Sequence, residues 1–181
     1  IWSRTGRVGE LPFYTSDGMG NITTTSFGDA TKADGNIIGM QPFLTAKDYA
    51  NEASFLQRLK PYMETAREKG WLTKTTIVVF PEYIGSWLVA ANEKEKVYDP
   101  ALSITDALTL QVTSNLFRFL PAYFNSSSAD KTREALFRMK QPEIVKIYQA
   151  VFGGLAKEYN VTIVAGSAVL AEPSVSKDGA I

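Results

Sequence analysis

The chain has 181 residues, of which 45% are hydrophobic and 12% aromatic, a composition typical of a globular protein with a sizeable core. The 19 basic and 19 acidic residues cancel, and no cluster of Lys and Arg is interleaved with aromatic residues, so we expect no nucleic-acid partner. The chain contains no histidine and no cysteine. These 181 residues alone therefore cannot form a Ser-His-Asp site, the commonest metal centres or a disulfide.

Compartment and membrane association stay open at this point. No apolar run reaches the roughly 20 residues that a membrane span requires, and the chain begins with Ile1 instead of Met, so we expect that an upstream segment has been lost. The lack of cysteine slightly favours a reducing, cytoplasmic compartment. A lost signal peptide or membrane anchor would instead place the protein in the cell envelope or at a membrane.

The first 35 residues differ in character from the rest. Residues 1–35 are rich in Gly, Thr, Ser and Asp without a sustained period, which predicts an irregular leader. From Asn36 the apolar run 37–41, closed by Pro42, predicts a buried strand. We therefore expect residues 36–181 to belong to one domain that begins at residue 36.

A helix is predicted after this strand. Thr45 and Asp48 have the spacing of a capping box, and apolar residues then recur at helical spacing until Gly70. Pro61 lies inside this pattern, where it costs about 3 kcal/mol in a regular helix. We expect a kink or a break near Lys60.

Two further strands give the fold class. Residues 75–80 are β-branched or aromatic and are closed by Pro81, and residues 161–165 form a similar run that is followed by Gly166 and Ser167. The helix between the first two strands has the length that a parallel pair needs. Alternation of strands and helices predicts an α/β fold with a layered sheet.

The region between these two strands is predicted to be helical. Ser103 and Asp106 begin a strongly apolar helix that runs to Pro121 and should be largely buried. Residues 125–130 then form a polar linker.

Two more helices follow the linker. The first, residues 131–140, is charged and ends before Pro142. The second carries Ile144 and ends at Asn160, a residue suited to a left-handed cap.

Glu82 is the candidate catalytic residue. It follows the strand 77–80 directly after Pro81, at the carboxyl end of the strand, where ligands bind in parallel sheets. Proline stiffens the turn that carries the carboxylate. The apolar neighbours of Glu82 would disfavour the charged form of its carboxyl group, which suits a general base. These neighbours are Phe80, Tyr83, Ile84 and Trp87. The alternative is that Glu82 is an ordinary helix-starting or solvated loop residue.

The run Val78-Val79-Phe80-Pro81-Glu82 resembles the strand-Phe-Pro-Glu signature of the nitrilase superfamily of carbon–nitrogen hydrolases. Upstream, a strand ending in Gln41 and a helix precede it, and downstream residues 155–167 are similar to the helix-to-strand passage of that family. The resemblance covers roughly residues 36–170. It implies that the chain is the N-terminal part of a four-layer α-β-β-α sandwich, incomplete at its C-terminus.

The resemblance also implies an activity. Members of this family hydrolyse a non-peptide carbon–nitrogen bond of an amide, nitrile or carbamoyl compound through a Glu-Lys-Cys triad, without metal or organic cofactor. Only Glu82 matches the motif, because Lys177 does not fit the position of the family's lysine and the chain reaches Ile181 without a cysteine. The fragment alone should therefore be inactive. For the complete protein we expect a small-molecule amide or nitrile substrate and a homo-oligomer.

This sequence departs from the family pattern in one region. The stretch between residues 82 and 155 is longer than the pattern usually allows, and the helix 103–120 and the linker that starts at Asn125 look like an insertion. Trp87, Tyr98 and Tyr123 lie near it and are candidates for lining a substrate pocket, although such aromatic residues more often belong to a core.

Two other functions stay open, a catalytically inactive member of the family and a generic α/β binding or interaction domain. A glycosidase is less favoured because no second carboxylate at a matching strand end stands out. A half domain would also expose a sheet edge and an apolar face, so we expect low solubility.

Overall fold

The computed structural model describes residues 21–29 and 34–171. Within the predicted leader, the described residues carry neither helix nor strand. The remainder of the leader, and the C-terminal residues from 172 onward, lie outside the described part.

A three-stranded parallel sheet organises the fold. Strands β1 (Ile37–Gly39), β2 (Ile77–Val79) and β3 (Thr162–Val164) are hydrogen-bonded in the order β1-β2-β3. All three predicted strands and the α/β class are confirmed, and β2 is the central strand. The prediction of a buried first strand is wrong, because β1 lies at an edge, where the side chain of Ile37 is 74% exposed.

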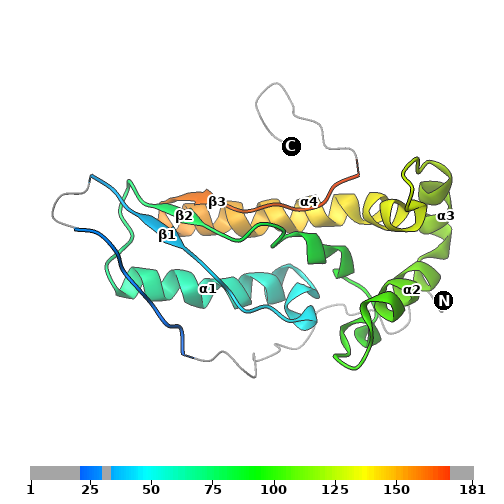
Figure 1. Cartoon of the computed structure of the whole chain (residues 1–181), viewed down its shortest axis with the longest axis horizontal. Coiled ribbons are helices and arrows are strands. Elements are labelled where there is room, and N and C mark those ends of the chain that lie inside the picture. The colour runs from blue at the N-terminus through cyan, green and yellow to red at the C-terminus, as the bar shows by residue number, and fades with distance from the viewer. Residues whose placement is uncertain (1–20, 30–33, 172–181) are drawn as a thin grey trace.

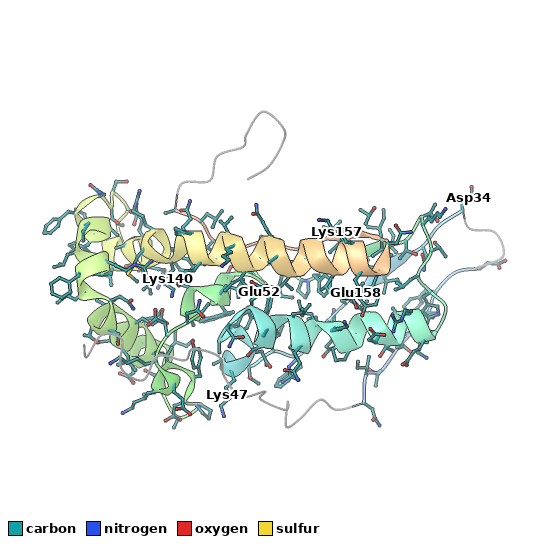
Figure 2. All side chains as sticks on the ribbon, turned by 180° about the vertical axis from the view of Figure 1, so that it is seen from behind. Asp34, Lys47, Glu52, Lys140, Lys157 and Glu158 are labelled. Carbon is teal, nitrogen blue, oxygen red and sulfur yellow. The ribbon has the colours of Figure 1, made fainter. Side chains whose placement is uncertain are left out.

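Two long helices cover one face of this sheet. Helices α1 (Glu52–Glu68) and α4 (Lys131–Tyr159) run side by side along it (Figures 1 and 2). Val78 of the central strand points into the core between sheet and helices, and Phe152 of α4 contacts both Phe55 and Phe80 through edge-to-face ring contacts of 5.9 and 5.2 Å. Such aromatic burial is a large part of what stabilises the layers.

The opposite face of the sheet carries apolar side chains that remain exposed. Ile37, Ile77 and Val164 point to this side, and Ile77 and Val164 are 38% and 50% exposed. Parallel sheets are usually covered on both faces, since their strands are apolar on both sides. The described residues thus supply helices for one face only.

The start of α1 differs from the prediction. The Thr45 and Asp48 capping box stands at the start of a short 3-10 helix, η2 (Ala46–Tyr49). Helix α1 is instead capped by Asn51, whose Oδ1 accepts the N–H of Ser54 at 2.9 Å. The predicted break near Lys60 is also wrong, because α1 is a single helix through Pro61.

Burial of neighbouring side chains accounts for this continuity. Leu59 and Met63, on either side of Pro61, are wholly buried. Burying each contributes about 1.5–3 kcal/mol, enough to offset the cost of about 3 kcal/mol for the proline.

Helix α4 is one element where two were predicted. It continues through Pro142, so the predicted end before this residue is wrong. Met139 and Ile144, on either side, are buried against the core, whereas Pro142 itself is exposed. The predicted cap is confirmed: Asn160 ends α4 in the left-handed conformation, with φ of 51°.

Helices α2 (Ile104–Ser114) and α3 (Leu116–Phe124) lie at the end of the molecule opposite the amino ends of the strands (Figure 1). The predicted cap at Ser103 is confirmed, since its Oγ accepts the N–H of Asp106 at 3.1 Å. The prediction of a single helix that ends at Pro121 is wrong. The helix is interrupted at Asn115, and Pro121 lies inside α3.

The predicted burial of this region is also wrong. Only part of each helix faces the core, and Phe117 is 90% exposed.

Candidate functional site

Glu82 lies in a turn directly after the central strand. Residues 81–84 form a β-turn in which the N–H of Ile84 donates to the carbonyl of Pro81 at 3.4 Å. Tyr83, at the third position of the turn, has φ of +61°, the sign that a type II turn requires. The next helix, the 3-10 helix η3 (Ser86–Ala90), begins only after this turn. Glu82 is therefore a turn residue and does not start a helix.

The end of the neighbouring strand β3 holds this turn at two points. The side-chain oxygen of Ser167 accepts the N–H of Tyr83 at 3.0 Å, across 84 positions in the sequence. The carbonyl of the same serine accepts the N–H of Gly85, also at 3.0 Å. Both ends of the segment that follows Glu82 are thus bonded to one residue.

Two glycines make this close approach possible. Gly166 has φ of +75°, and a Cβ atom there would lie 2.1 Å from the carbonyl oxygen of Pro81. A Cβ atom on Gly85 would lie 2.7 Å from the ring of Tyr148 on α4. The hydroxyl of Tyr148 donates to the carbonyl of Gly166 at 3.1 Å, and burial raises the pKa of this phenol. The turn is consequently packed between β3 and α4.

The surroundings of Glu82 are less apolar than its sequence neighbours suggest. Phe80 and Ile84 are buried beneath the turn, but Tyr83 and Trp87 are 58% and 48% exposed. The Glu82 side chain is itself exposed. Within the described residues, the predicted apolar environment around this carboxylate is therefore only half formed.

The other aromatic candidates belong mainly to the core. Tyr98 is buried in the 3-10 helix η4 (Glu95–Tyr98), and its hydroxyl donates to the carbonyl of Ala90 at 2.6 Å and accepts the N–H of Glu93 at 3.0 Å. Tyr123 is partly buried and packs against Phe119 of the same helix. These contacts favour the core role over pocket lining.

Two open cavities of the described residues lie away from Glu82. One, of about 760 Å³, lies between α1 and residues 21–22, and the other, of about 530 Å³, lies between the start of α4 and residues 169–171. Glu134 lines the second cavity; a hydrogen bond from Arg138 and N–H groups of Ser128 and Ser127 lower the pKa of its carboxyl group to about 2. This carboxylate ties residues 127 and 128, which precede α4, to the first turn of the helix, and it is not placed for chemistry at Glu82.

A buried cluster of two charged side chains and one amide, which we call the Lys140 cluster, comprises Lys140, Glu93 and Asn115. Lys140 and Glu93 are wholly buried, and the Lys140 Nζ lies 3.0 Å from a carboxylate oxygen of Glu93 and 2.5 Å from the carbonyl of Ala91. The amide nitrogen of Asn115 donates to both carboxylate oxygens of Glu93 at 3.0 Å. Lys140 also pairs with Glu143 of α4.

Sequence reasoning missed the Lys140 cluster, although one signal was present. Lys140 lies on the same helix face as Leu136 and Ile144, four residues away on either side, and both of these are buried. Figure 2 shows Lys140 on the half of α4 that is remote from the sheet. The cluster fastens the segment between β2 and α4 to that helix, and it has no exposed surface for a substrate.

The described residues contain neither a candidate metal site nor a membrane-spanning helix. No group of three or more acidic side chains in residues 21–29 and 34–171 is arranged to hold a metal ion. In the same part of the chain, no helix is both long enough and apolar enough to cross a bilayer. Lys177 lies outside the described residues.

Comparison with protein-family models, with curated proteins and with solved structures finds no match to this chain.

Proposed function

We propose that the chain is the N-terminal part of a carbon–nitrogen hydrolase of the nitrilase type, in which Glu82 is the general base. The observation that carries this proposal is the place of Glu82 at the carboxyl end of the central strand of a parallel sheet. Its turn is held there by two hydrogen bonds to Ser167. The resemblance of Val78-Val79-Phe80-Pro81-Glu82 to the family signature supports it.

The proposed reaction has two steps. A cysteine thiol loses its proton to Glu82 and attacks the carbon of an amide, a bond from sulfur to carbon forms, and the amine leaves with a proton returned from Glu82. Water then attacks the thioester carbon while Glu82 takes a proton from it, the bond from carbon to sulfur breaks, the carboxylic acid leaves, and Glu82 returns the proton to the cysteine sulfur. Because these 181 residues contain no cysteine, the proposal assigns the thiol, and the lysine that stabilises the developing negative charge, to polypeptide outside them.

The uncovered face of the sheet supports the proposed four-layer sandwich. The exposed Ile37, Ile77 and Val164 form an apolar surface of the kind that a second sheet covers at a distance of about 10 Å. A second layer at this face would also remove water from the strand ends. Glu82 would then acquire the surroundings that make a carboxylate a base near neutral pH.

A second candidate is an α/β domain that binds a partner without catalysis. One observation favours it: the Glu82 side chain is exposed and lines neither of the two cavities described above.

Hydrolysis by a polypeptide extended at its C-terminal end separates the two candidates. Ammonia release would be measured with a panel of short aliphatic amides and nitriles, for the unaltered protein and for Glu82→Gln. We expect kcat to fall by about 10²–10⁴-fold, the usual contribution of general base catalysis, with an unchanged melting temperature. Glu95→Gln, which alters another exposed glutamate, is the matched control.

Three results would count against the hydrolase. They are an extended polypeptide without cysteine, a Glu82→Gln variant that retains its kcat, and an equal loss in both variants. The 181 residues alone should release no ammonia from any of these compounds.

A further inference from the structure

We infer that Ser167 is a positioning residue for Glu82, so that the proposed base depends on a hydroxyl group 85 positions away in the sequence. The inference deepens the proposed function and rests on it. It follows from the contacts that hold the Glu82 turn, and no part of the sequence signature indicates it.

The first reason is the conformation of the turn. Tyr83 has a positive φ of 61°, a backbone conformation that residues other than glycine rarely adopt. Such a conformation persists only where neighbouring groups hold it. The side-chain oxygen of Ser167 accepts the N–H of this same residue at 3.0 Å. Loss of that acceptor would let the peptide between Glu82 and Tyr83 rotate, and the carboxylate would move with it.

The second reason is that the acceptor is itself fixed. The carbonyl of Ser167 accepts the N–H of Gly85 at 3.0 Å, so the serine backbone is bonded to the turn independently of its side chain. Gly166 allows the two chains to approach, and the hydroxyl of Tyr148 on α4 bonds its carbonyl at 3.1 Å. Replacing the Ser167 side chain should therefore leave the strand in place and release only the N–H of Tyr83.

This separation gives a sharp test in the 181-residue chain. Amide hydrogen exchange, followed by NMR, would compare the N–H groups of Tyr83 and Gly85 in Ser167→Ala and in Ser167→Thr, which keeps the hydroxyl. We expect exchange at Tyr83 to be about five- to tenfold faster in the alanine variant, as loss of one hydrogen bond implies, and within about threefold of the unaltered chain in the threonine variant. Exchange at Gly85 should change in neither.

The catalytic consequence is tested in the C-terminally extended protein. A displaced base should lower kcat by about 10–100-fold in Ser167→Ala, with KM within about twofold, and the threonine variant should restore most of the loss. An unchanged kcat in the alanine variant, or unchanged exchange at Tyr83, would overturn the positioning role. Equal loss of kcat in both variants would overturn it too.

Failure of the proposed function gives a different pattern. If Glu82→Gln retains its kcat, the base assignment is wrong, and a positioning role toward a base is wrong with it. If Glu82→Gln loses activity while Ser167→Ala does not, only the role of Ser167 is wrong.

Discussion

Removing the charge of Lys140 should be among the most damaging single changes in this fold. The Lys140→Met variant keeps the length of the side chain and leaves the negative charge of Glu93 buried after its positive neighbour is gone. Removing one member of a buried ion pair typically costs about 3–5 kcal/mol. Since 1 kcal/mol shifts the melting temperature of a chain of this size by about 2–4 °C, we expect a fall of about 6–20 °C.

Urea unfolding at pH 7 measures this change against two comparison variants. Lys60→Met removes the cation of an exposed pair, in which Lys60 and Glu158 are 42% and 40% exposed, and should cost less than about 1 kcal/mol. The double variant Lys140→Met with Glu93→Gln removes both buried charges and should be more stable than Lys140→Met alone.

Either of two results would refute the reasoning. One is a loss of less than about 1 kcal/mol in the free energy of unfolding for Lys140→Met, because leaving a buried charge unpaired should destabilise the fold by more than this. The other is a double variant that is no more stable than Lys140→Met alone, which would mean that the buried charge of Glu93 is not what destabilises the single variant.

Other predictions concern the turn, the start of α4 and the surface of α3. Gly166→Ala should cost at least about 2 kcal/mol in urea unfolding, because of the clash with the Pro81 carbonyl and the positive φ, whereas Gly153→Ala, in open space on α4, should be neutral or stabilising. The pKa of Glu134 lies at about 2, below its ordinary value of 4.5, so its contribution to stability is present above pH 4.5 and lost as the pH falls toward 2. Unfolding curves of Glu134→Gln and the unaltered chain should therefore differ at pH 7 and converge near pH 2. Phe117→Ser should change the free energy of unfolding by no more than about 0.5 kcal/mol, since this ring is 90% exposed, whereas Phe119→Ala, at 6% exposed, should cost about 3–5 kcal/mol.

Strands were easier to predict from the sequence than helix boundaries. Short β-branched runs closed by proline, such as residues 75–80, carry a local signal that tertiary contacts did not alter. Proline was a poor guide inside helices, because Pro61 and Pro142 each lie between buried side chains whose packing outweighs one lost hydrogen bond. At the break between α2 and α3, the side chain of Asn115 donates to Glu93, 22 positions away, a contact that no local pattern reveals.

The candidate site was predictable only at its first residue. The place of Glu82 at the end of the central strand follows from the strand and from Pro81, which are both visible in the sequence. Gly166 and Ser167 could be recognised as a turn, but their contacts with the Glu82 turn require the parallel register of β2 and β3. The Lys140 cluster joins three segments, and no local pattern brings them together.

Formation of the thioester tests the central claim most directly. The polypeptide extended beyond residue 181 would be mixed with the amide that it turns over fastest, and the mass of the acylated protein would be followed at pH 7 over a single turnover. The account predicts acylation about 10²–10⁴-fold slower in Glu82→Gln than in the unaltered protein, with Glu95→Gln unchanged. Equal acylation rates in all three proteins, or no acylated protein at all, would contradict it.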